Sequence, residues 1–203
     1  EKPIAAPYAT VHYKVSTLDL DSIIQLAKVE KVKFILTVCT DQALLIAAQA
    51  SEILGLYFPL SYLMARNLTN KRWMKGVLVQ HVIPTSHYKI FTNLDSILLE
   101  DLKYPLVIKP VDSNSSKGVM RIDSGKDLAE GFMHAASYSR SNEVIIEEFV
   151  CGIELSIDAF VSRGEAKILL ISKSEKLNDN NRTDFPIHRS VAPFIISEKQ
   201  QSE

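Results

Sequence analysis

The sequence has few of the residues that mark fibrous, disulfide-rich or membrane-spanning chains. Only 7 glycines and 2 cysteines occur among its 203 residues, which excludes a collagen-like repeat and a disulfide-rich scaffold. No run approaches the roughly 18 apolar residues that span a bilayer, and the first residues do not resemble a secretory signal. We therefore expect a cytoplasmic protein in which Cys39 and Cys151 are buried free thiols.

An excess of charge of one sign is also lacking. The sequence contains 23 lysines and arginines against 24 aspartates and glutamates, which gives a net charge of -1. Such a balance provides no field that would hold nucleic acid or an anionic membrane, so neither is expected as a partner. A phosphate-binding site would have to gather a few lysines locally. The hydrophobic share of 46% is that of a globular protein with one large or two small domains.

The first part of the chain has the pattern of a parallel α/β protein. Residues 22–29 follow an aspartate cap and carry apolar residues at helical spacing. Residues 34–38 form a continuous apolar run, which is typical of a strand buried on both faces. A second helix is predicted over residues 43–54, with Gly55 at its end. We expect this part to end near residues 60–70.

The rest of the chain predicts an α+β region dominated by hairpins. Helices are expected over 71–75, 92–102 and 127–138, the first of them ended by Gly76. Strands are expected over 106–108, 119–122 and 143–150, followed by a hairpin of 154–161 and 166–172. Residues 173–189 are rich in Asn, Asp and Lys with little periodicity, which indicates a mobile loop.

Two segments carry candidate chemistry. In the first, a buried strand delivers Lys109 at its end, and the small-residue loop 112–118 follows; an ammonium group and backbone amides of this kind can bind phosphate. In the second, residues 144–154 form a strand that ends in apolar residues and is followed by Glu154. Such a strand edge suits the polar edge of a purine, and a carboxylate suits a ribose diol. Taken singly, each segment is equally compatible with lysines and glutamates that only face solvent.

In this order the two segments resemble the ATP-grasp superfamily. The resemblance implies that Lys71 and Lys109 contact phosphates and that a loop containing Ser115, Ser116, Lys117 and Gly118 closes over them. It also implies that the hinge from Glu147 to Glu154 holds the nucleoside. In that hinge Phe149 and Val150, next to Glu148, would bind adenine through their backbone, Glu147 would accept from its amino group, and Glu154 would bind ribose.

The resemblance extends to the fold and to the branch of the superfamily. Residues 35–43 are similar to the strand, turn and helix of the domain that precedes ATP-grasp regions. The implied fold is α/β (α+β), with a partial Rossmann-like domain over 1–65 and an ATP-grasp nucleotide-binding region over 66–203. The hinge spacing and residues 171–176 look most like the carbamoyl-phosphate synthase-like and L-amino-acid ligase branch.

The resemblance implies ATP and Mg²⁺ as cofactors. The family's metal ligands, a carboxylate on a late strand and a Glu-x-Asn pair, have no counterpart in the sequence, so we expect them beyond Glu203. The first strand and helix of the preceding domain are likewise expected before Glu1. No catalytic residue and no metal ligand is assigned within the chain.

The implied activity of the complete protein is that of a ligase forming C–N bonds. ATP would phosphorylate a carboxylate to an acyl phosphate, an amine or ammonia would attack it, and residues 174–189 would shield it from water. The partners are then ATP and small carboxylate and amine substrates, with a homodimer left open. One alternative is a nucleotide-binding fragment or degenerate member without turnover, and another is an α/β scaffold with no nucleotide site.

Overall fold

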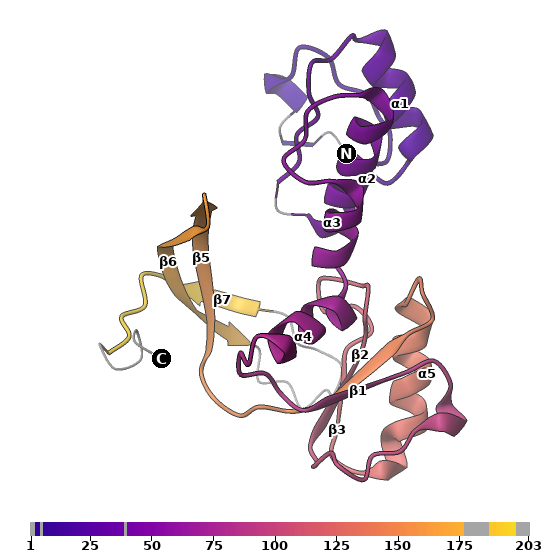
Figure 1. Cartoon of the computed structure of the whole chain (residues 1–203), viewed down its shortest axis with the longest axis vertical. Coiled ribbons are helices and arrows are strands. Elements are labelled where there is room, and N and C mark those ends of the chain that lie inside the picture. The colour runs from indigo at the N-terminus through magenta and orange to yellow at the C-terminus, as the bar shows by residue number, and fades with distance from the viewer. Residues whose placement is uncertain (1–2, 5, 39, 177–186, 198–203) are drawn as a thin grey trace. The chain divides into compact units, whose positions relative to one another are not determined.

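A computed structural model describes residues 3–4, 6–38, 40–176 and 187–197 of the chain (Figure 1). Contacts divide it into two compact units, residues 1–74 and residues 75–203. The assignment of residues 1–65 and 66–203 to two family domains stays a prediction. In the described part of the chain, no helix has the length and apolar character that crossing a membrane requires.

The first unit is helical, and α1 and α2 correspond to the two helices predicted here, whereas α3 and the short 3-10 helix were not predicted. It contains a short 3-10 helix (Ala6–Tyr8), α1 (Leu20–Val29), α2 (Asp41–Leu54) and α3 (Tyr62–Leu68). The Asp19 carboxylate accepts from the Ser22 amide at 3.1 Å and starts α1. Gly55 ends α2 in the left-handed conformation, with φ of 64°. The two predicted helices of this region are therefore confirmed.

The prediction of a buried strand over residues 34–38 is wrong. Phe34 forms one isolated parallel bridge with Tyr57. Phe34, Leu36 and Val38 are 64%, 76% and 71% exposed. Among the described residues of this unit, no strand lies beside the segment to bury its two faces, and an apolar run alone does not supply that partner.

The second unit contains a four-stranded antiparallel sheet. Its strands are β1 (Tyr88–Phe91), β2 (Leu106–Pro110), β3 (Met120–Ile122) and β4 (Val144–Glu148), in the order β1-β4-β2-β3. Helix α5 (Leu128–Tyr138) packs against one face, as Figure 1 shows. Gly131 permits this close approach, because a Cβ there would lie 2.8 Å from the Ile108 Cδ1. The core consists of Leu102, Leu106, Ile108, Met120, Ile122, Phe132, Ala135, Val144 and Ile146.

Strand alternation places a different set of side chains on the opposite face of this sheet. Val107 pairs with Glu147 on β4 and with Arg121 on β3. Directly paired residues share a face, and residues two apart along a strand do the same, so Lys109 joins this set. The face away from α5 is therefore the one that carries the charged residues of the two predicted segments.

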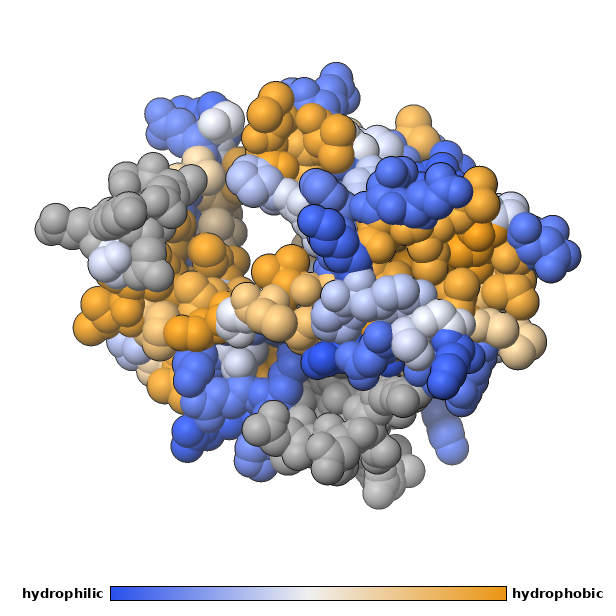
Figure 2. Space-filling model, turned by 90° about the horizontal axis from the view of Figure 1, so that it is seen from below, coloured by the Kyte–Doolittle hydropathy of each residue, from blue (hydrophilic) through white to orange (hydrophobic). Residues whose placement is uncertain are grey.

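A second antiparallel sheet follows. It consists of β5 (Glu154–Ser162), β6 (Glu165–Lys176) and β7 (Ile187–Val191) in sequential order. The predicted hairpin is confirmed, with Gly164 in its turn at a φ of 83°. The loop predicted over 173–189 is wrong at both ends, which belong to β6 and β7 because they pair with each other; residues 177–186 lie outside the described residues. Apolar side chains of this hairpin are exposed. Figure 2 shows that hydrophobic residues also reach the surface on the face of the molecule seen from below.

Two helix predictions need correction. Helix α4 (Lys71–Gln80) continues through Gly76 and does not end there. Residues 92–102 form only a 3-10 turn (Leu94–Ser96). Their apolar members Leu94, Ile97 and Leu99 pack on the core from an irregular segment, so helical spacing arose here without a helix. A second 3-10 turn (Gly125–Asp127) precedes α5.

The cysteine prediction also changes. Cys151 has a free thiol but is exposed. Strand β4 ends at Glu148, and residues 150–153 are exposed, so the predicted burial of Cys151 is wrong. Cys39 lies outside the described residues.

Candidate functional site

A buried charged cluster lies on the sheet face away from α5. The Lys75 Nζ lies 2.8 Å from Glu147 Oε2, and Lys109 donates to Glu147 Oε1. The side chains of Lys75, Lys109 and Glu147 are 13%, 21% and 11% exposed. Two ammonium groups thus share one carboxylate, which leaves an excess of positive charge in a place largely removed from water.

Backbone elements hold each member of this cluster. Lys109 and Glu147 lie on the neighbouring strands β2 and β4. Lys75 lies on α4, and its Nζ donates to Thr85 Oγ1 and Ser86 Oγ, each at 2.7 Å. The Ser86 hydroxyl in turn donates to Glu147 Oε2 at 3.1 Å. Thr85 and Ser86, in the segment between α4 and β1, therefore hold the Lys75 side chain in place.

The charge of Glu147 follows from these contacts. Burial alone would raise the pKa of its carboxyl group. The Lys109 charge and hydrogen bond, together with those of Lys75, outweigh burial and hold the pKa below its usual value. Glu147 is therefore ionised at neutral pH and serves as the counter-ion of both lysines.

A pocket of about 310 Å³ opens beside this cluster. It brings Lys109 and Glu147 together with the hinge and with Glu154 on β5. The Nζ of Lys176 on β6 lies 2.6 Å from the Glu154 Oε2, so Lys176 adds a second ammonium group to the pocket lining beside that of Lys109. The lining residues are Ser86, Val107, Lys109, Ser116, Val119, Glu147, Glu148, Phe149, Val150, Glu154 and Lys176.

The hinge is tied to the rest of the sheet. The Phe149 amide donates to the Pro105 carbonyl at 2.9 Å, and the Arg121 guanidinium lies 4.7 Å from the centre of the Phe149 ring. The Glu148 carboxylate accepts from the Lys103 amide at 2.9 Å. These contacts orient the hinge, and they engage the amide of Phe149 within the protein.

The predicted phosphate loop has a strained backbone and a fixed base. Ser115, Ser116 and Gly118 have φ values of 54°, 57° and 70°. At the start of the loop, the Asp112 carboxylate accepts from Ser139 Oγ at 3.0 Å and from the Ser141 amide at 2.8 Å. Only Ser116 of the loop's predicted site residues lines the pocket; Ser115 and Lys117 are exposed, and Gly118 is buried against Tyr138.

Most of the second unit is similar to a known protein family. Residues 69–183, more than half of the chain, match the family described as phosphoribosylglycinamide synthetase, ATP-grasp (A) domain. The chain belongs to the ATP-grasp family. The ATP-grasp fold predicted from the sequence is thereby confirmed.

Relatives of this ATP-grasp chain include D-alanine–D-alanine ligases. The protein from Geotalea uraniireducens is 28% identical over 127 residues, which cover 61% of this chain and 40% of the relative. The protein from Bordetella petrii is 31% identical over 111 residues, 53% of this chain and 33% of the relative. The chain thus spans less than half the length of these ligases.

Two solved structures are similar to the ATP-grasp chain. An L-amino acid ligase from Bacillus licheniformis superposes with a TM-score of 0.72 at 26% identity, covering 90% of this chain and 42% of that one. An ADP complex of an N5-carboxyaminoimidazole ribonucleotide synthetase superposes with a TM-score of 0.75 at 22% identity, covering 97% and 50%. The second likeness concerns the fold alone.

On α4, the lysine that contacts Glu147 is Lys75, whereas the sequence predicted Lys71. Lys71 belongs to the first compact unit, and its contact with phosphate stays a prediction. Lys75, which was missed, lies four residues later in the same helix and contacts Glu147. The signal was present, since residues four apart lie on one helix face and the predicted helix contained both lysines.

The described residues do not form a metal site. Nowhere in the described part of the chain do three His, Cys, Asp or Glu side chains gather in a way that could hold a metal ion. The magnesium expected from the resemblance therefore has no ligand set here, and no chemical step is assigned to it.

Proposed function

We propose that this chain is the ATP-binding part of an ATP-dependent ligase that joins a carboxylate to an amine or to ammonia. The observation that carries the proposal is the convergence of Lys75 and Lys109 on one buried carboxylate beside the pocket. Membership of the ATP-grasp family supports it, as does similarity to proteins named as ligases.

The residues of the proposed nucleotide site divide between phosphate and nucleoside. Lys75 and Lys109 neutralise phosphate charge, and bound phosphate supplies the negative charge that the cluster lacks. Glu147 holds the two ammonium groups in position. These contacts engage its carboxylate, so they would compete with the predicted hydrogen bond from the adenine amino group. The hinge at Phe149 and Val150 faces adenine. Lys71, Ser115, Lys117 and Gly118 keep their predicted roles in phosphate binding, and Glu148 and Glu154 theirs in holding the nucleoside.

The reaction consists of two transfers. A substrate carboxylate oxygen attacks the γ-phosphorus of ATP, the bond to the leaving ADP breaks, and an acyl phosphate forms. The amine nitrogen then attacks the acyl carbon, loses a proton, and displaces phosphate. The part of this chain is to position ATP and to neutralise charge on its phosphates. The proposed lid over residues 174–189 falls mostly outside the described residues, and no catalytic residue is assigned.

We also propose a branch within the ATP-grasp superfamily. We assign the chain to the carbamoyl-phosphate synthase-like and L-amino-acid ligase branch, which the similarity to the Bacillus licheniformis ligase supports. A cytoplasmic location, magnesium as cofactor and a homodimeric state are proposed with it. An amino acid would then be the first carboxylate substrate to test.

A titration with fluorescent ATP, followed by a phosphate-release assay, tests the proposal. Lys109→Ala should weaken ATP binding at least about tenfold, whereas the matched variant Lys126→Ala, at an exposed lysine outside the pocket, should bind as the wild type does. If wild type and Lys109→Ala bound ATP equally poorly, the proposal of a nucleotide site would be wrong. ATP binding without phosphate release, over a panel of amino acids with amines or ammonia, would favour the alternative of a nucleotide-binding member without turnover.

A further inference from the structure

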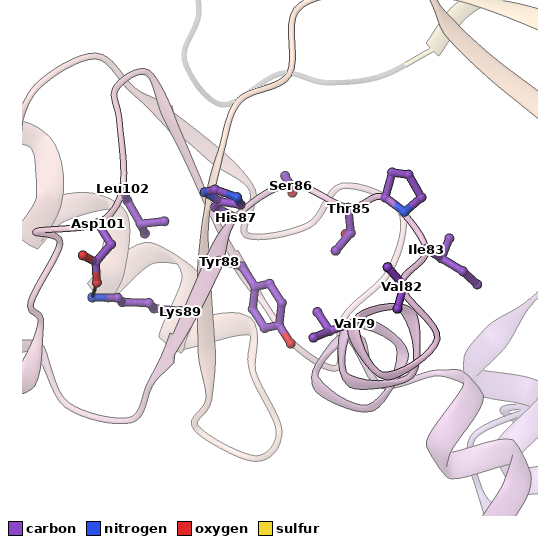
Figure 3. Close-up of a pocket in the computed structure, with 11 residues that line it drawn as sticks. Val79, Val82, Ile83, Thr85, Ser86, His87, Tyr88, Lys89, Asp101 and Leu102 are labelled. Atoms are coloured by element: carbon purple, nitrogen blue, oxygen red, sulfur yellow. Dashed lines mark ion pairs between the residues drawn. The ribbon is translucent and has the colours of Figure 1, made fainter. Parts of the chain in front are cut away.

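A second and larger pocket lies at the outer edge of β1 (Figure 3). Its volume is about 620 Å³, within the range of sites that bind organic ligands. Most of its residues take no part in the nucleotide site. It is lined by Val79, Val82, Ile83, Pro84, Thr85, Ser86, His87, Tyr88, Lys89, Asp101 and Leu102.

The floor of this groove is the free edge of a strand. Among the described residues, β1 is the edge strand of its sheet and pairs only with β4. The Glu148 amide donates to the His87 carbonyl, and antiparallel pairs alternate between hydrogen-bonded and non-bonded partners. Lys89 and Phe91 therefore bond to β4, whereas the N–H and C=O groups of Tyr88 and Ile90 are directed to the open edge.

Walls stand on both sides of that edge. In Figure 3 the side chains of Tyr88 and Lys89 leave β1 in opposite directions, Tyr88 toward Val79 of α4 and Lys89 toward Asp101. The α4 side is apolar, since Val79 is followed by Val82 and Ile83. The other side is charged, because Lys89 pairs with Asp101 at 3.0 Å. A strand edge between an apolar wall and a charged wall fits a guest whose side chains alternate in character.

The apolar wall is presented by a strained residue. Val82 follows the end of α4 with a φ of 57°, and the residue is 89% exposed. The left-handed conformation is costly for a β-branched residue, and glycine is usual at such a position. The sequence therefore keeps a valine side chain at the groove where glycine would suit the backbone better.

From these observations we propose that the groove binds an extended peptide segment, which adds a further strand to the sheet beside β1. Its backbone pairs with the open groups of Tyr88 and Ile90. Alternate side chains are apolar and contact Val79, Val82 and Ile83. The others are basic, because the Lys89 ammonium already contacts Leu98 O and Asp101, whereas the Asp101 side chain is 82% exposed and can accept a second cation.

Fluorescence anisotropy with a labelled peptide of alternating valine and lysine tests the proposal. Ile90→Pro removes an N–H that faces the open edge and leaves the β4 hydrogen bonds, so it should weaken binding at least about tenfold. Val82→Gly removes one wall side chain while relieving strain, so it should weaken binding about fivefold without lowering the melting temperature. Neither variant should change the affinity for ATP.

Two further readouts separate backbone pairing from other modes of binding. In hydrogen exchange, the peptide should protect the amides of Tyr88 and Ile90. The same peptide methylated on alternate backbone nitrogens should not bind. Equal affinity of the methylated peptide, or unchanged binding by both variants, would overturn the proposal. So would a chain that dimerises through β1, with Ile90→Pro abolishing the dimer, because the occupant would then be a second copy.

Discussion

At the scale of single residues, Glu147 is the group on which the cluster depends. Changing Glu147→Gln leaves two largely buried ammonium groups without their carboxylate, and breaking such a buried pair costs about 3 kcal/mol of unfolding free energy. The matched variant Glu148→Gln, on the neighbouring residue, should cost about 1 kcal/mol or less. Urea unfolding measures both, and equal costs would contradict the buried counter-ion role.

The same residue predicts a dependence on pH. The pKa of Glu147 is lower in the folded protein than its usual value, despite burial, because of Lys109 and Lys75. Its contribution to stability is therefore complete above the ordinary carboxyl pKa of about 4.3 and is lost as the pH falls through the lower folded value. The stability difference between wild type and Glu147→Gln should thus shrink in acid. A difference that stays constant down to the acid transition would contradict this pKa direction.

The sequence alone indicated several residues of this site, but it did not indicate all of the residues that pair with them. Lys109 was found from its place at the end of an apolar strand, and Glu147 and Glu154 from the resemblance to the ATP-grasp hinge; all three line the pocket. Their partners come from distant segments: Lys75 from α4 and Lys176 from β6. Which side chain neutralises which depends on tertiary packing, which strand and helix patterns do not specify.

At the scale of elements, the loop between β2 and β3 requires a glycine at one position. Gly118 has a φ of 70°, and a Cβ there would lie 2.9 Å from the Tyr138 Cβ. Gly118→Ala should therefore lower the unfolding free energy by about 2 kcal/mol or more. Thermal unfolding measures it. Gly164→Ala is the matched variant, since its φ is 83° but no atom lies within 4 Å; its cost should be smaller, at about 1 kcal/mol.

Helix α4 offers a change in the opposite direction. Gly76 lies inside the helix, and a Cβ there would meet no atom within 4 Å. Gly76→Ala should raise the unfolding free energy by about 0.5–1 kcal/mol, because alanine loses less backbone entropy in a helix. A lower stability on urea unfolding would mean that α4 ends near this glycine, as the sequence suggested.

The base of the phosphate loop depends on Asp112. Its carboxylate accepts hydrogen bonds from Ser139, Arg140 and Ser141, and these hold its pKa below the usual value although burial raises it. Asp112→Asn should cost about 2 kcal/mol of unfolding free energy. Because the folded pKa is the lower one, this cost should be full near neutral pH and fade in acid. An equal cost at both pH values would show that charge is not the cause.

Elements with clear local signals were predicted, whereas apolar spacing without such signals was misleading at two segments. The aspartate before α1 and the glycine after α2 are caps that any sequence reading can use. The run over 34–38 lacks a strand partner among the described residues, and residues 92–102 have helical spacing but pack as an irregular segment. Strand β1 was missed because four half-buried residues give no clear alternation.

At the scale of the whole molecule, the pocket depends on segments that meet only after folding. It takes residues from the β2–β3 region, from the hinge after β4 and from β5 and β6. The order of motifs along the chain identified the ATP-grasp family, but the pairing of Lys75 with Glu147 required the structure. We therefore expect the phosphates of ATP to bind at the carboxylate that Lys75 and Lys109 share.

Calorimetric titration of ATP and adenosine into wild type and Lys75→Met tests whether phosphate binds at this carboxylate. Lys75 lies in the cluster and outside the hinge, so the variant should lose at least about tenfold in ATP affinity while adenosine affinity stays unchanged. An ATP affinity equal to that of the wild type, in a variant that remains folded, would contradict the account.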